Sequence, residues 1–181
     1  MRTLLVIILF PLSISLCSGQ LRSAGIALGF GGTIVDVAKA VEWDNLEEWD
    51  TWAIILKAAG EYKLSDGLSL GGEFGANRLY YWEYRYSDGT YTNYRYGTEW
   101  TVNLGVNLTK YFSENFYIKG GAGLHFFISG GTVPGLLAAA GYNLNIGEKL
   151  ILPLELRIEP VFGNATPVPV LFGTGLRYRL H

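Results

Sequence analysis

The sequence predicts an all-β fold, an eight-stranded antiparallel β-barrel of the up-and-down type in which each strand lies beside the one before it. Three observations predict this fold. Apolar residues alternate with small or polar residues in eight segments, three short turns set one common register, and aromatic residues gather near the ends of the segments. Alternation indicates strands because successive side chains of a strand point to opposite faces.

The segment 99–110 shows the alternation most clearly. Every second residue from Trp100 to Leu108 is apolar, and the residues between them are small or polar. About ten residues are enough for a tilted strand to cross a bilayer. The other strands are expected over 23–32, 51–64, from 68 into a tyrosine-rich arm at 79–97, and over 116–128, 136–146, 150–161 and 168–180.

Short connections of turn-type residues fall at 65–67, 113–115 and 147–149, and each has an apolar residue on both sides. Three residues is a common length for a hairpin loop. The flanking pairs expected to face each other are Leu64 with Leu68, Phe112 with Phe116, and Ile146 with Leu150.

This pairing sets the register of the strands. The opposite pairs that follow from it are Glu61 with Gly71, Thr109 with Lys119, and Gly141 with Glu155. Agreement among three independent turns supports one register. The longer connections, after the first, third, fifth and seventh strands, then lie at the other end, and closure into a barrel removes edge strands.

The two faces of the strands differ in kind. One face is rich in Leu, Ile, Val and Phe, and the other holds mainly Gly, Ala, Ser, Thr and Asn. Small residues suit the narrow interior of an eight-stranded barrel. The charges on that face have both signs, as burial requires. We expect a lumenal polar network of Lys57, Glu61, Glu73, Lys119, Glu155, Arg157, Glu159 and Arg177, with Arg179 on the same face.

An apolar exterior indicates a membrane protein. The segment 150–158 carries five large aliphatic residues on one face, which suits lipid. Aromatic residues are expected in two belts, which are typical of outer-membrane barrels. Those near the long loops are Trp52, Tyr80, Trp82, Trp100 and Phe126, and those near the short turns are Tyr62, Phe112, Phe116 and Tyr178. The alternative is a soluble β-protein with the same aromatic residues in its core.

The composition of the 181-residue chain agrees with a membrane barrel. Charged residues make up 17 % of it, against about 25 % in typical soluble domains, and the mean hydropathy is +0.20. The net charge of −2 gives no sign of a nucleic-acid partner. Beyond the first residues, no apolar run reaches the length of a membrane helix.

The start of the chain reads as a signal peptide, residues 1–19, which leaves a barrel domain at 20–181. Arg2 precedes the apolar run 4–16, and small residues follow at 17–19. Acylation of Cys17, as in a lipoprotein, is the alternative, but Leu16 stands where that site needs a small residue. Cys17 is the single cysteine, so the mature chain would hold no thiol.

Together the strand pattern and the C-terminal run Gly175–Leu180 resemble a known family. The run is similar to the Gly-x-x-aromatic-x-hydrophobic signal of outer-membrane barrels, although His181 follows where that signal ends in Phe or Trp. The chain resembles the small eight-stranded outer-membrane barrels of the OmpA/OmpX type and the porin-like outer-membrane barrels of Bacteroidota.

The resemblance implies a place in the outer membrane of a Gram-negative bacterium. It implies short turns in the periplasm, long loops outside the cell, and contact with outer-membrane lipids and lipopolysaccharide. It also implies insertion by the barrel-assembly machinery.

No catalytic residue, metal site or cofactor is assigned, because the sequence has no phosphate loop, nucleophile elbow or His/Cys cluster. His125 is expected in the lumen near the long loops. Some eight-stranded outer-membrane barrels are lipid A deacylases, in which the resemblance implies a His-x-Ser motif. His125 and Ser129 are four positions apart and do not match that motif. In the loop 33–50, the acidic residues could bind a divalent cation or simply face water.

The tyrosine-rich arm is the strongest candidate for a binding surface, since tyrosine and arginine are enriched in recognition surfaces. It is expected to be a protruding hairpin with its turn at Asp88-Gly89. The candidate ligand-binding residues are Tyr84, Arg85, Tyr86, Tyr91, Tyr94 and Arg95. A structural or adhesive role follows. A stiff extension packed on lipopolysaccharide sugars, a lipid A-modifying enzyme and a small-solute pore remain as alternatives.

Overall fold

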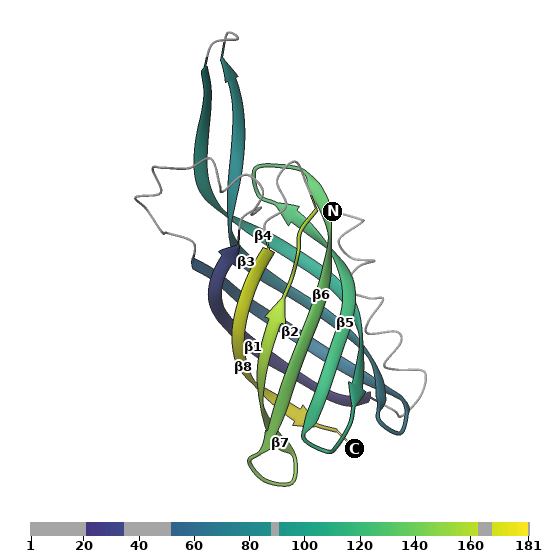
Figure 1. Cartoon of the computed structure of the whole chain (residues 1–181). Helices are drawn as coiled ribbons and strands as arrows, with labels where there is room; N and C mark the ends of the chain where they lie inside the picture. Colours follow the sequence, from purple (N-terminus) through teal and green to yellow (C-terminus); the bar gives the residue numbers. More distant parts are fainter. Residues whose placement is uncertain (1–20, 35–51, 88–90, 163–167, 181) are drawn as a thin grey trace.

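The computed structural model describes residues 21–34, 52–87, 91–162 and 168–180, without the side chains of 34 and 79–98. It is a closed barrel in which each of eight antiparallel strands pairs with its neighbours in sequence, and β8 pairs with β1 (Figure 1). The strands are β1 Leu21–Ile34, β2 Trp52–Ser65, β3 Leu68–Ser87, β4 Tyr91–Tyr111, β5 Phe116–Phe127, β6 Thr132–Asn145, β7 Leu150–Ile158 and β8 Val168–Arg179. The expected fold class is confirmed. Among the described residues, no helix is long and apolar enough to cross a membrane.

The expected register is confirmed on all three short-turn hairpins. The pairs are Glu61 with Gly71, Thr109 with Lys119, and Gly141 with Glu155. Backbone hydrogen bonds also join the expected flanking residues of two turns, from Phe112 N to Phe116 O at 3.0 Å and from Ile146 N to Leu150 O at 2.9 Å.

The first short turn differs from the expectation. Lys63 pairs with Ser69 and Ser65 pairs with Leu68, so Leu64 is the extra residue of a bulge and does not face Leu68. Only Asp66 and Gly67 then connect the strands, and Gly67 adopts a φ of 77°. Glycine takes this conformation at little cost, which makes the two-residue turn possible.

Two details at the opposite end were also predicted wrongly. The connection after β5 is not long, since β5 ends at Phe127 and β6 begins at Thr132, and Gly130 and Gly131 both have positive φ. β7 ends at Ile158 rather than at residue 161, although Val161 still forms a bridge to Gly135. Pro160 interrupts the ladder between them because proline has no N–H to donate.

The barrel is apolar outside and polar inside, the reverse of a water-soluble domain. On β7, Leu156 and Ile158 are exposed while Arg157 between them is buried. Ile26, Phe74 and Val106 are each more than half exposed on the outer surface. The interior holds a small apolar cluster of Ala53, Ile55 and Leu171, and the rest of it is largely polar.

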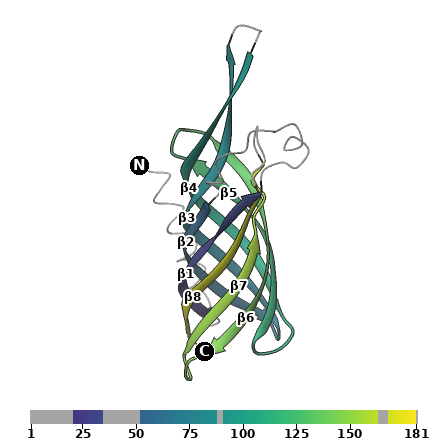
Figure 2. The same ribbon diagram turned by 60° about the vertical axis from the view of Figure 1, so that its left-hand side comes forward.

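A two-stranded ribbon rises from the barrel. β2 last pairs with β3 at Arg78, and β5 last pairs with β4 at Thr101. β3 and β4 stay paired beyond these residues, up to Ser87 opposite Tyr91. Figures 1 and 2 show this hairpin standing well clear of the other strands, at the end opposite the short turns.

Candidate functional site

Glu73 lies at the centre of the lumen and faces three cations. Its carboxylate lies 3.4 Å from Lys57 Nζ, 3.1 Å from Lys119 Nζ and 2.7 Å from Arg157 Nη1. These cations come from β2, β5 and β7, so one carboxylate of β3 joins strands around most of the barrel. The alternation of each strand turns these side chains inward.

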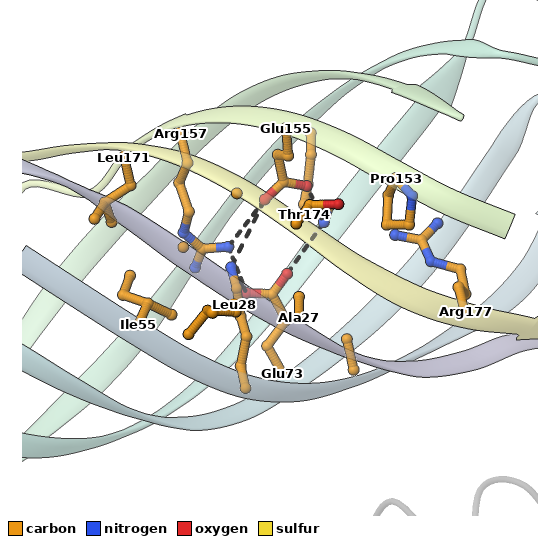
Figure 3. A pocket seen from close by; sticks show the side chains of 15 residues that line it. Ala27, Leu28, Ile55, Glu73, Pro153, Glu155, Arg157, Leu171, Thr174 and Arg177 are labelled. Atoms are coloured by element: carbon orange, nitrogen blue, oxygen red, sulfur yellow. Dashed lines mark hydrogen bonds and ion pairs between the residues drawn. The ribbon is translucent and has the colours of Figure 1, made fainter. Parts of the chain in front are cut away.

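Glu155, on β7, is a second carboxylate that faces the same cations. It lies 2.8 Å from Lys119 Nζ, 3.7 Å from Lys57 Nζ and 3.5 Å from Arg157 Nη1. The hydroxyl of Tyr117 donates a further hydrogen bond to it at 3.1 Å. Figure 3 shows Glu155 and Arg157 reaching from one strand toward Glu73 on the opposite wall.

The network continues toward both ends of the barrel. Toward the long loops, Arg157 Nε donates to Glu159 at 2.7 Å, and His125 Nε2 lies 3.4 Å from the other oxygen of Glu159. Toward the short turns, Arg177 pairs with Glu61 at 3.1 Å. The hydroxyl of Tyr111 also donates to Glu61, at 2.6 Å.

The structure therefore places in the lumen the whole expected set of Lys57, Glu61, Glu73, Lys119, Glu155, Arg157, Glu159 and Arg177. Positive and negative charges are equal in this set, which offsets the cost of burying them. Arg179 lies apart, at the short-turn rim, where it donates to Asn145. The network predicted from the sequence left out Tyr111 and Tyr117. Both alternate with the apolar residues of their strands and so lie on the polar face.

Small voids lie beside the ion pairs. One of about 40 Å³ is lined by charged residues of the network together with Ile55 and Leu171, and another of about 10 Å³ lies near His125. Such volumes hold at most a few water molecules. Around the ion pairs, the described side chains thus fill the lumen as a plug.

His125 and Ser129 make separate contacts. His125 is buried in the lumen, with an exposed fraction of 1 %. The hydroxyl of Ser129 donates to Glu99 at 2.9 Å, and the Ser129 N–H donates to the same carboxylate. Within the described ranges, no group of three His, Cys, Asp or Glu side chains could hold a metal ion. Most of the acidic loop, at 35–51, and the expected signal peptide lie outside the described residues.

The hairpin carries the candidate binding residues. Tyr84 pairs with Tyr94, Arg85 with Asn93, and Arg95 with Glu83. Tyr86 and Tyr91 stand near the tip, opposite Thr92 and Ser87. Their side chains, and the turn 88–90, lie outside the described part of the chain.

The contact of Glu99 with Ser129 fixes the hairpin base to the β5–β6 loop, and the sequence gives no sign of it because it depends on that loop's conformation.

Aromatic side chains stand exposed at both ends of the apolar exterior. At the long-loop end, Phe30 stacks on Trp52 with ring centres 4.7 Å apart, and Trp100 is exposed on β4. Phe112 and Phe116 pack together at the short-turn end. Tyr142 and Tyr178 are exposed on the strands beside that end. The side chains of Tyr80 and Trp82 lie outside the described part.

No protein-family model and no curated protein matches the chain. Its fold is similar to that of bacterial proteins whose structures have been solved. Neisserial surface protein A superposes with a TM-score of 0.61 at 9 % identity, covering 87 % of this chain and 96 % of that one. Outer membrane protein OprG of Pseudomonas aeruginosa gives 0.53 at 11 % identity, covering 90 % and 97 %. The resemblance expected from the sequence is confirmed at the level of the fold: the chain has the eight-stranded barrel of small outer-membrane proteins.

Proposed function

We propose that this chain is an integral protein of a Gram-negative outer membrane that binds an extracellular ligand through its β3–β4 hairpin. The observation that carries the proposal is the paired ribbon beyond Arg78 and Thr101, which projects from a barrel whose interior is filled. The plugged barrel is the membrane anchor, and the hairpin is the working surface.

The exterior supports the membrane location. Leucine, isoleucine, valine and phenylalanine side chains lie exposed on every strand of the barrel, where water would make them an aggregation surface. Hydrocarbon is the solvent that suits them. The closed ladder pairs the backbone groups around the barrel, as a membrane demands.

The composition of the hairpin supports binding. Tyrosine offers a large contact area at low entropic cost, and arginine offers a planar charged fork. The ribbon stands away from the lipid. Its residues therefore contact a ligand on another surface before the residues of the barrel do.

The test compares the full chain with a variant in which residues 83–95 are replaced by Asn-Gly. Both are refolded in detergent and applied to arrays of glycans and extracellular-matrix proteins. A heat-dependent shift of mobility on a gel shows that each barrel is closed. We expect a discrete binder that the shortened variant and a Tyr84→Ala/Arg85→Ala/Tyr94→Ala variant both lose. Equal binding profiles for the full chain and the shortened variant would contradict the proposal.

Two other functions have their own tests. A small-solute pore conflicts with the ion pairs that cross the lumen, and steady single-channel steps in planar bilayers would favour it. A lipid A-modifying enzyme would change the acyl pattern in the lipid A mass spectrum of a deletion strain. An unchanged spectrum is expected for a binding protein.

A further inference from the structure

Arg22 is turned into the barrel by a β-bulge. Leu21 pairs with Tyr62 and Ser23 with Glu61, so Arg22 is the extra residue of β1. Strict alternation would place it outside, on the face of Ala24. Instead its guanidinium lies 3.9 Å from the ring centre of Tyr111, and Nη1 lies 3.4 Å from Ser69 Oγ. Bulges commonly redirect a side chain in this way.

Arg179, the last residue of β8, is held at the same end. Its Nη2 donates to Asn145 Oδ1 at 3.2 Å, and the Asn145 amide donates in turn to Asn115 at 3.3 Å. Asn115 then donates to the hydroxyl of Tyr142 at 3.1 Å. A chain of hydrogen bonds along the rim therefore orients this guanidinium.

The two arginines line an open hollow of about 560 Å³ at the short-turn mouth. Its other lining residues are Lys63, Asp66, Gly67 and Glu114. Lys63 and Asp66 form an ion pair at 2.6 Å and cancel each other. Lys110 Nζ adds a positive charge beside Gly67. Among the described residues at this hollow, Glu114 alone then opposes Arg22, Arg179 and Lys110, so their net charge is positive.

The two arginines also lack the partners that the lumenal arginines have. Arg157 and Arg177 each pair with a glutamate, whereas Arg22 and Arg179 have no carboxylate partner within the described residues. Among the described residues, each donates one side-chain hydrogen bond, from one guanidinium nitrogen to a neutral side chain. The other N–H groups of a guanidinium suit two oxygens of one anion.

We propose that this hollow binds a phosphate group between Arg22 and Arg179. The group is a tetrahedral oxyanion whose oxygens accept from both guanidinium edges. It could be carried by an anionic phospholipid headgroup or by a free phosphate compound, and the experiment below separates these two sources. The site lies at the end of the barrel away from the hairpin and does not depend on the hairpin's role.

The first arm uses the full chain in an uncharged detergent and inorganic phosphate as the probe. Titration is followed by the NMR signals of the arginine Nε–H groups and by calorimetry. We expect saturable shifts of the Arg22 and Arg179 signals. Arg22→Gln or Arg179→Gln should weaken the affinity about tenfold, the effect of losing one charge-assisted hydrogen bond. Glu114→Gln should strengthen it.

Lys149→Gln is the matched control, because it removes one positive charge at the same end while Lys149 faces the Tyr178 ring outside the hollow. It should leave the affinity within about twofold. Arg22→Lys keeps the charge but not the fork, so it should bind weakly in a barrel that still closes, as the gel shift shows. Equal losses in Arg22→Gln and Lys149→Gln, or no saturable binding, would overturn the proposal.

The second arm repeats the titration in nanodiscs of phosphatidylcholine with and without phosphatidylglycerol. If the headgroup is the ligand, phosphatidylglycerol should compete with phosphate in the wild type but not in Arg22→Gln. If a free compound is the ligand, the affinity for phosphate should be the same in both nanodiscs. Competition that persists equally in Arg22→Gln would count against the site.

Discussion

Glu73 and Glu155 share the same cations, but they are not equivalent. Glu73 lies within 3.4 Å of Lys57, Lys119 and Arg157, whereas only Lys119 approaches Glu155 that closely. Arg177 lines the same cavity as Glu155 but pairs with Glu61. Loss of one partner from a buried pair leaves an uncompensated charge, which is the main cost.

We therefore predict that Glu155→Ala lowers the free energy of unfolding by about 3 kcal/mol, and Glu73→Ala by more. Glu148→Ala, in an exposed turn, is the control and should have little effect. Denaturant unfolding in detergent micelles, followed by gel mobility, measures all three. Equal midpoints for Glu155→Ala and Glu148→Ala would refute the structural role of the network.

Gly141 leaves the space that the side chain of Tyr117 occupies. A Cβ at Gly141 would overlap the ring and hydroxyl of Tyr117, which donates to Glu155. We predict that Gly141→Ala destabilises the barrel by about 1–3 kcal/mol through this overlap. On the outer face, Gly72 has nothing within 4 Å of its added Cβ, so Gly72→Ala should be neutral. The same unfolding measurement compares them, and similar effects of both changes would contradict this reason.

Besides the backbone hydrogen bond from Ile128 N to Trp100 O at 3.3 Å, Glu99 connects β4 to the β5–β6 loop. Its carboxylate accepts from the N–H and the hydroxyl of Ser129. We predict that Glu99→Ala increases hydrogen exchange at the Ser129 amide. The Phe116 amide, which donates to Ser113 Oγ at 3.0 Å in a distant turn, should exchange as before. Unchanged exchange at Ser129 would show that the contact does not hold the loop.

The strands were largely predictable, and their irregularities were not. A period of two fixes which face each side chain takes, and apolar flanks fix the register of a short turn. The two-residue alternation fails where a strand has an extra residue, as at Arg22 and Leu64. The strand pairing fails where a residue has no N–H to donate, as at Pro160. Likewise, charged residues could be assigned to the lumen because they alternate with the apolar residues of their strands. Their individual partners depend on strand stagger and side-chain length, which a single sequence does not reveal.

We predict that the apolar exterior, with exposed aromatic side chains at both ends, sets the depth of the barrel in the proposed membrane. Indole rings favour the level of the lipid headgroups. Trp52 and Trp100 stand exposed at one end of the exterior, where that level should lie. The ion pairs inside play no part in the depth because they face away from the lipid.

Variants that keep only Trp52 or only Trp100, with phenylalanine at the other tryptophans, test this depth in bilayers of brominated phospholipids. We predict that bromines near the headgroup quench the fluorescence of each more strongly than bromines at the chain end, because the belt lies at the edge of the hydrocarbon. Phe74→Trp added to a tryptophan-free chain is the control. Phe74 is 56 % exposed on β3 within the apolar band, so deeper bromines should quench it best. Equal quenching of all three positions by shallow and deep bromines would mean that the belts do not set the barrel's depth.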